Sequence, residues 1–235
     1  IYFDFAAYTA IALGAARTMG IRLINNFDRP WFSKNITEFW RRWHISLTRW
    51  IGDYIYLPMV KSGRVSKLLA VFIVFFIIGL WHGANWTFVI WGLLNAFYLV
   101  LEVSTTILRK RIFGKIGLAG YPERFIGWVT GVILIVFSLI FFRSQTLSDA
   151  ILFISNIPNI KNLHINIADS YFELILSCIL ILSVQSIHYF KGNEKVYELV
   201  TRQKTVTRWS MYMLYIAIVV LFAINRQSTF IYFQF

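Results

Sequence analysis

The sequence predicts an all-α, polytopic membrane protein with about six apolar helices and one amphipathic helix at the membrane interface. Two observations lead to this fold class. Of the 235 residues, 58% are hydrophobic and 14% are charged, whereas a soluble domain carries about 25% charged residues. The mean hydropathy is +0.62, and the apolar residues gather in long segments with short polar connections. We expect residues 1–235 to form a single membrane domain.

The net charge is strongly positive, because 23 Lys and Arg residues stand against 11 Asp and Glu residues, giving +12. Basic residues commonly flank membrane helices on the cytoplasmic side. A nucleic-acid surface would need these residues clustered on a soluble face, and the sequence contains no such cluster. We therefore expect membrane lipid, and no nucleic acid, as a partner.

Residues 1–24 are apolar and rich in small side chains, which suits close packing of helices in lipid. Residues 25–33 predict a loop, since Pro30 disfavours the helical conformation at Arg29. The chain begins at Ile1, and no basic segment precedes an apolar core, so no signal peptide is recognisable. We expect the chain to be the later part of a longer protein, without that protein's N-terminal helices.

Residues 35–56 predict an amphipathic helix. Asn35 can cap its N-terminus, and Glu38 follows three residues later as in a capping box. Apolar side chains recur at helical spacing on one face, namely Ile36, Phe39, Trp40, Trp43, Leu47, Trp50, Ile51 and Tyr54. Arginines project from the opposite face, and His44 lies at the edge of the apolar stripe. Trp on one face and Arg on the other is typical of a helix that lies in the membrane interface.

Two apolar helices follow, with His82 between them. Pro58 is expected to end the amphipathic helix, and a basic turn then leads into residues 68–81, which are all apolar. At 1.5 Å per residue this segment is about 21 Å long, shorter than the roughly 30 Å hydrocarbon core. Gly83 allows a break, after which a second helix runs over residues 85–103. We therefore expect His82 at a break inside the membrane profile.

Three further apolar segments predict helices near residues 125–142, 171–190 and 208–225. The basic connections alternate onto one side of the membrane, which the positive-inside rule makes cytoplasmic. They are residues 61–67, 109–115 and 191–208. The sparsely charged connection at 143–170 and the C-terminal tail fall on the other side. We expect a multi-pass protein of the cell inner (plasma) membrane.

Two of the four histidines, His82 and His44, are the candidate catalytic residues. Acyl transfer to a hydroxyl needs a base that takes the hydroxyl proton, and histidine is the usual one. Each has a structural alternative: His82 as a helix cap beside an interfacial Trp, and His44 as part of an aromatic belt. His164 and His188 lie in no motif of this kind and are expected to be structural. The sequence contains no metal-ligand spacing, Gly-rich phosphate loop or serine-nucleophile motif.

The segments NITEFWRRWHISLTRWIGDYIYLP (residues 35–58) and GLWHGANWTFVIWGLLNA (residues 79–96) together closely resemble the membrane-bound O-acyltransferase (MBOAT) family. Within it the chain is similar to the bacterial branch of alginate O-acetylases and teichoic-acid D-alanyl transfer proteins. The opening YFDFAAYTAIALGAARTMGIRLINNFDRPW and the closing FIYFQF resemble the alginate O-acetylase side. The resemblance is dense over residues 1–100, sparse over 101–225, and returns at the tail.

The resemblance implies a many-helix membrane fold with a tunnel, of which this chain would be the C-terminal portion. It implies an acyltransferase that moves an acyl group, acetyl first, to hydroxyls of an extracytoplasmic polysaccharide. The co-substrate would be a cytoplasmic acyl thioester, acetyl-CoA or carrier-linked, with no bound cofactor and no metal. The catalytic histidine of the WHG motif carries over to His82, and the histidine of the RWHIS motif, which lines the same site, to His44. An accessory periplasmic or extracellular acyltransferase is a further partner to expect.

The sequence departs from the family pattern at two places. Ala6, Ala7 and Ala10 replace the usual Ser-Gly pair and an acid, and MVKSGR, residues 59–64, replaces a Gly-Gly-x-Arg turn. These departures bear on donor or acceptor specificity. Three alternatives stay open: D-alanyl transfer to teichoic acid, a transporter whose histidines relay protons, and an inactive scaffold. The few ionisable residues inside the apolar segments argue against a relay. A shared catalytic site would require a mostly buried His82 and one cavity faced by both His82 and His44.

Overall fold

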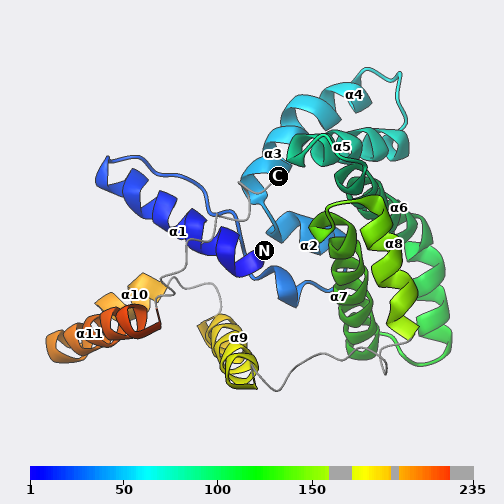
Figure 1. Cartoon of the computed structure of the whole chain (residues 1–235). Coiled ribbons are helices and arrows are strands. Elements are labelled where there is room, and N and C mark those ends of the chain that lie inside the picture. Colours follow the sequence, from blue (N-terminus) through cyan, green and yellow to red (C-terminus); the bar gives the residue numbers. More distant parts are fainter. Residues whose placement is uncertain (159–170, 192–195, 223–235) are drawn as a thin grey trace. The chain divides into compact units, whose positions relative to one another are not determined.

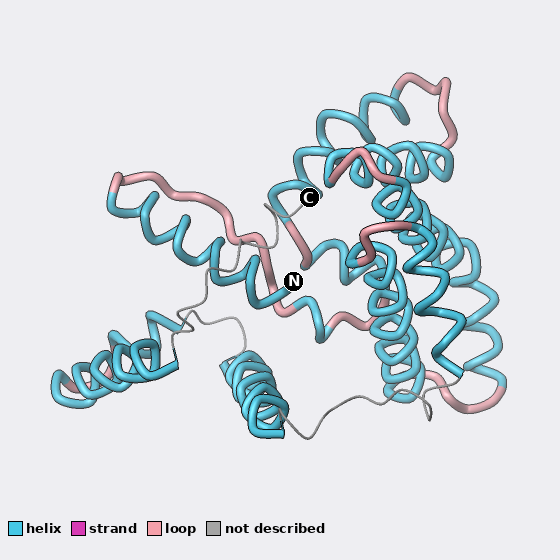
Figure 2. Tube along the Cα trace, viewed as in Figure 1, coloured by secondary structure: helices cyan, strands magenta, loops and turns pink. Residues whose placement is uncertain are grey.

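The computed structural model describes residues 1–158, 171–191 and 196–222, and these residues form helices joined by loops, without strands (Figures 1 and 2). They divide into two compact units. The first unit contains the described residues up to 158, and the second those from 171 to 222. The all-α class predicted from the sequence is therefore confirmed for the described residues.

The first helix, α1 (Tyr2–Thr18), ends earlier than the predicted segment 1–24. The backbone turns at Gly20, where φ is +77°, a conformation that glycine adopts readily. A loop then leads to the short 3₁₀ helix η1 (Pro30–Phe32). The rings of Tyr2 and Phe5 pack edge-on against Phe27 of this loop, with centroids 5.4 and 5.1 Å apart. The loop is therefore held against the start of α1.

The single amphipathic helix expected over residues 35–56 is wrong, because the segment is broken at His44. The structure has α2 (Ile36–Arg42), α3 (Ile45–Ile51), a π-helical turn η2 (Gly52–Tyr56) and α4 (Leu57–Lys61). His44 adopts a left-handed conformation with φ +46°. Asn26 stabilises the break: its carbonyl oxygen accepts from Ile45 N at 3.0 Å, and its Oδ1 accepts from Ser46 N at 3.1 Å.

The start of α2 agrees with the prediction in part, whereas the predicted helix end at Pro58 is wrong. Asn35 caps α2 as predicted, because its Oδ1 accepts from Glu38 N at 2.8 Å, whereas Glu38 Oε2 accepts from Lys34 N rather than from the cap residue. Pro58 does not end the helix. It lies in the first turn of α4, directly after the wider turn η2, where a missing N–H is tolerated.

Three helices form the main packed body of the first unit: α5 (Lys67–His82), α6 (Trp86–Lys115) and α7 (Tyr121–Arg143). The prediction of a helix over 68–81 is confirmed, with Ser66 as its cap, and Asn85 caps α6. α6 extends 12 residues beyond the predicted end at residue 103, so the basic residues 109–115 lie in its last turns. Long basic side chains can extend from a helix end into the polar interface, which explains why they did not end the helix.

Of the described helices, α6 and α7 are long and apolar enough to cross a membrane. Shorter apolar helices are Lys67–His82, Leu147–Asn156, Leu174–Phe190 and Thr205–Val220. One of them, α8 (Leu147–Asn156), lies where the sequence predicted only a connection. Thr146 and Asp149 form a capping box at its start, and this local signal was overlooked.

The second unit contains α9 (Tyr171–Lys191), α10 (Val196–Thr201) and α11 (Thr205–Phe222). α9 agrees with the predicted segment 171–190, and α11 begins three residues before the predicted 208. His188 lies on α9, and His164 lies outside the described residues.

Glu102, near the middle of α6, holds the N-terminus of α2. Its Oε2 accepts from the backbone N–H groups of Ile36 at 2.7 Å and Thr37 at 3.4 Å, and its Oε1 accepts from Thr37 Oγ1 at 2.9 Å. The first N–H groups of a helix have no partner within the helix. The Glu102 carboxylate, 66 residues away in the sequence, is the acceptor for the first N–H of α2. Because α2 carries Trp40, Glu102 also fixes that ring relative to α6.

We expect Glu102→Ala to lower the free energy of unfolding by about 1–3 kcal/mol, because the N–H of Ile36 loses its acceptor and Ile36 is only 3% exposed. Thermal unfolding of the full-length protein in detergent measures this. The matched control is Glu123→Ala: Glu123 pairs with Arg109 at 3.7 Å, and both side chains are partly exposed. Such pairs contribute about 0–1 kcal/mol. Equal losses of unfolding free energy in the two variants would show that Glu102 does not hold α2 against α6.

Candidate active site

His82 is the last residue of α5, and aromatic rings surround it. Its ring centroid lies 5.1 Å from that of Trp91, 5.0 Å from Phe142 and 4.9 Å from Trp81. The next residue, Gly83, is extended, with φ 167°, so its conformation does not demand glycine. A Cβ there would instead lie 2.7 Å from the Phe88 ring, so glycine is needed for close packing. Most of the His82 side chain is buried, as we expected.

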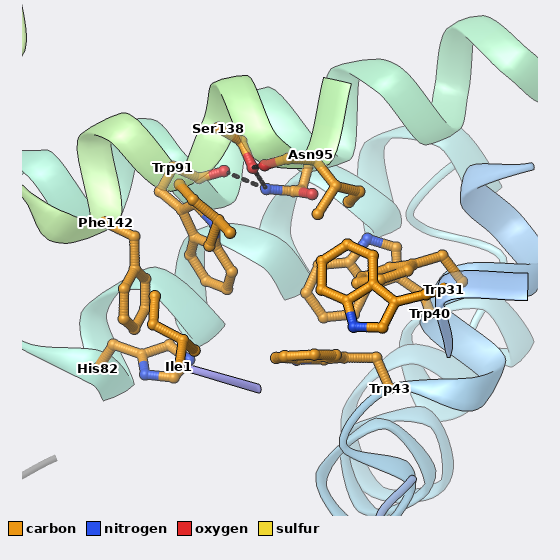
Figure 3. Close-up of a pocket in the computed structure, with 12 residues that line it drawn as sticks. Ile1, Trp31, Trp40, Trp43, His82, Trp91, Asn95, Ser138 and Phe142 are labelled. Carbon is orange, nitrogen blue, oxygen red and sulfur yellow. Dashed lines mark hydrogen bonds between the residues drawn. The ribbon is translucent and has the colours of Figure 1, made fainter. Parts of the chain in front are cut away.

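His82 borders a cavity of about 410 Å³, its mouth included. Aromatic rings make most of its wall: Trp31, Phe39, Trp40, Trp43, Trp91 and Phe142. The rings come from η1, α2, α6 and α7 and from the residue after α2, so segments far apart in the sequence build the cavity (Figure 3). A narrow apolar cavity with few polar groups is the usual form of a small-molecule site.

Besides the indole nitrogens of the tryptophans, the polar side chains that line the cavity are His82, Asn95 and Ser138. Asn95 and Ser138 have no exposed surface. Asn95 Nδ2 donates to the carbonyl oxygen of Trp91 at 2.8 Å and to Ser138 Oγ at 3.2 Å, and Ser138 Oγ donates to the carbonyl oxygen of Ile135 at 2.8 Å (Figure 3). Neither residue was predicted from the sequence. An amide inside the apolar helix after the WHG motif was the available signal, since polar groups there are costly unless paired.

His44 does not line this cavity within the described part of the chain. Its ring packs against Phe5 of α1, with centroids 4.7 Å apart, and against Trp81, with centroids 6.0 Å apart. Trp81 also contacts His82, so the rings of both histidines contact the same indole. The structure therefore places His82, and not His44, on the wall of this cavity, and a site shared by both histidines stays a prediction.

Residues 1–140 match the sequence model described as MBOAT, membrane-bound O-acyltransferase family. The chain belongs to this family. The matched region contains both candidate histidines, Asn95 and Ser138. The site described above is therefore built almost entirely from the family's own segment, and the MBOAT membership makes the chain a membrane protein.

Three relatives illustrate the range of similarity. The chain is 38% identical over 149 residues to a probable alginate O-acetylase of Pseudomonas syringae pv. tomato, covering 63% of this chain and 27% of the relative. It is 34% identical over 154 residues to a peptidoglycan O-acetyltransferase of Helicobacter pylori, covering 64% and 28%. It is 40% identical over 105 residues to a teichoic acid D-alanyltransferase of Bacillus subtilis, covering 41% and 27%. The matched part thus spans little more than a quarter of each relative.

Arg42 of this MBOAT chain has a structural partner. Its Nη2 lies 2.6 Å from Glu38 Oε1, one turn earlier on α2, and its Nη1 donates to the carbonyl oxygen of Arg29 at 3.5 Å. Arg41 and Arg49 are exposed, as residues that contact lipid headgroups would be. Among the described residues, no group of three His, Cys, Asp or Glu side chains is arranged to hold a metal ion.

Burial lowers the pKa of His44 to about 4, because a charged imidazolium loses hydration there. Its Nδ1 is buried and has no hydrogen-bond partner among the described residues. His44 therefore stays neutral at pH 7 in the folded protein. In the unfolded chain its pKa returns to about 6.5.

We expect the thermal stability to fall as the pH drops from about 6.5 to about 4. In this window the unfolded chain binds a proton at His44 that the folded protein does not, so the free energy of unfolding rises with pH. The measurement compares unfolding midpoints of wild type and His44→Asn between pH 7.5 and 4.5. Asn tolerates the left-handed backbone at this position. The unfolding midpoint of His44→Asn should fall less steeply with decreasing pH than that of wild type. If the two midpoints fall in parallel, His44 does not lower the stability in this pH range.

Proposed function

We propose that this chain is the catalytic portion of a membrane O-acyltransferase that moves an acyl group, acetyl first, from a cytoplasmic thioester to hydroxyls of an extracytoplasmic polysaccharide. The observation that carries the proposal is His82 on the wall of a narrow aromatic cavity, inside the region that matches the MBOAT family. The names of the relatives support it, since they describe an alginate O-acetylase, a peptidoglycan O-acetyltransferase and a teichoic acid D-alanyltransferase.

In the proposed reaction His82 acts as the general base. The neutral imidazole takes the proton of the acceptor hydroxyl as its oxygen attacks the thioester carbonyl, which forms the C–O bond. The C–S bond then breaks, and the imidazolium returns the proton to the leaving thiolate. The aromatic wall limits the entry of water, which would otherwise compete with the hydroxyl for the acyl group.

In this proposal His44 assists through Trp81, which both histidines contact. Being neutral, it can donate one N–H bond to a group that orients the acyl carbonyl. Because it does not line the cavity in the described residues, its contribution is expected to be smaller than that of His82.

The proposal places the protein in the cell inner membrane as a multi-pass protein, with the basic connections on the cytoplasmic side. Its six apolar helices would act together with the helices of the longer protein, since relatives are almost four times the matched length. Membrane lipid surrounds it, and an accessory periplasmic or extracellular acyltransferase is a proposed partner. Neither a bound cofactor nor a metal is required for this chemistry.

The test is the mass of the cell-surface polysaccharide from wild type and from a strain in which the full-length gene is deleted. Loss of an acetyl increment supports O-acetyl transfer, and loss of a D-alanyl increment supports the alternative substrate. An unchanged polysaccharide overturns the acyltransferase proposal and favours a transporter or scaffold. Restoring the gene on a plasmid controls for secondary effects of the deletion.

A further inference from the structure

Two buried polar atoms on the cavity wall have no hydrogen-bond partner among the described residues: Asn95 Oδ1 and Trp40 Nε1. Both residues line the cavity beside His82, and they are 0% and 6% exposed. Buried polar atoms are nearly always paired, because leaving one unpaired costs the full desolvation of that group. Two such atoms in residues that line one cavity indicate a ligand that forms a hydrogen bond with each of them.

The orientation of the Asn95 amide is fixed by its neighbours. Its nitrogen donates to the Trp91 carbonyl oxygen, which can only accept, and to Ser138 Oγ, whose own proton is donated to Ile135. Turning the amide over would place two acceptors against Oδ1. Oδ1 is therefore held on the side away from Trp91 and Ser138, as Figure 3 shows.

The two unpartnered atoms are complementary. Asn95 Oδ1 is an acceptor, and the indole N–H of Trp40 can only donate. A hydroxyl group satisfies both, because it donates one hydrogen bond and accepts another. A carboxylate or ketone would leave Oδ1 unpaired, and an ammonium group would leave the indole N–H unpaired.

We propose that Asn95 and Trp40 form a binding site for a second, non-reacting hydroxyl of the acyl acceptor, beside the hydroxyl that His82 deprotonates. This inference rests on the proposed function. The reacting hydroxyl gives its only proton to His82, so it has none to donate to Asn95 Oδ1. The acceptor must therefore carry at least two hydroxyls close together, as a sugar residue does, and the site selects such polyols over simple alcohols.

The test uses the full-length protein in a strain that lacks its own copy, with protein amounts matched. We measure the initial rate of acyl incorporation into the cell-surface polysaccharide and the unfolding midpoint of the purified protein. Trp40→Phe keeps an aromatic ring and removes the unpartnered N–H. The rate should fall about tenfold, as expected for one lost neutral hydrogen bond, and the midpoint should fall by the packing lost when Phe replaces the indole that lies against Phe75 and Trp91. Trp209→Phe on α11, where Trp209 is 54% exposed, controls for the loss of any indole.

Asn95→Leu should lower the rate by a similar factor and also lower the midpoint, because the Trp91 carbonyl and Ser138 lose their donor. If both atoms bind one hydroxyl, the double variant should be little slower than either single variant. An unchanged rate in Trp40→Phe or fully additive losses in the double variant would each overturn the hydroxyl site.

His82→Gln in the same strain separates this inference from the proposed function. Loss of incorporation in His82→Gln with a normal rate in Trp40→Phe overturns the hydroxyl site alone. Retained incorporation in His82→Gln overturns the proposed function and the hydroxyl site with it. Loss of incorporation in His82→Gln and a reduced rate in Trp40→Phe, with the Trp40→Phe protein still folded at the assay temperature, support both proposals.

Discussion

Replacing His82 by Gln is expected to reduce acyl transfer to the polysaccharide by on the order of a hundredfold or more, the usual contribution of a general base. Glutamine fills a similar space and forms hydrogen bonds, but it cannot take and return a proton near neutral pH. The rate of acyl incorporation in a complemented deletion strain measures the effect. Protein amounts in the membrane are compared by immunoblot.

The unfolding midpoint of His82→Gln should change little in comparison. The imidazole packs edge-on against Trp91 and Phe142, and the glutamine side chain, which has a similar size, keeps most of this contact. His188→Gln on α9 is the matched control, because the same exchange is made outside the cavity, and it should leave the rate intact. A near-normal rate in His82→Gln would end the assignment of His82 as the base.

Local signals in the sequence were enough to predict the helices around His82. Residues 68–81 are uniformly apolar, Ser66 and Asn85 are good caps, and the structure places α5 and α6 accordingly. These features act over a few residues, so neither packing nor distant partners had to be known. The position of His82 at a helix end followed from them.

Features that depend on distant residues were not predictable in this way. The apolar stripe over residues 35–56 continues through the break at His44, and the break is stabilised by Asn26, which bonds to residues about 20 positions later. Likewise, Asn95 and Ser138 are 43 residues apart and meet only when α6 packs on α7. One sequence shows such residues but not which of them meet.

The contact between α5 and α6 is the second place where a small change should have a large effect. Gly79 on α5 and Gly92 on α6 face each other's backbone. A Cβ at Gly92 would collide with the carbonyl oxygen of Phe75, and one at Gly79 would lie at 2.6 Å from that of Phe88. Backbone atoms cannot rotate away as a flexible side chain can, so the helices must move apart to admit a methyl group.

We expect Gly92→Ala to lower the free energy of unfolding by about 1–3 kcal/mol, the usual cost of overpacking, and to reduce acyl transfer strongly. His82 lies three residues after Gly79, near the same face of α5, so separation of the helices shifts the imidazole from the cavity wall. A displacement of about 1 Å at a reacting group can cost a hundredfold in rate. Unfolding midpoint and incorporation rate are both measured on the full-length protein.

Gly114→Ala on the same helix is the matched control, since a Cβ there meets nothing within 4 Å. Alanine is a better helix former than glycine by about 1 kcal/mol, so this variant should be as stable as wild type or more so, with normal activity. His82→Gln and Gly92→Ala should then differ in kind. The first removes the base from an intact site and keeps the midpoint, whereas the second displaces the base and lowers the midpoint. If Gly92→Ala behaves like Gly114→Ala, the close approach of α5 and α6 is not what positions His82.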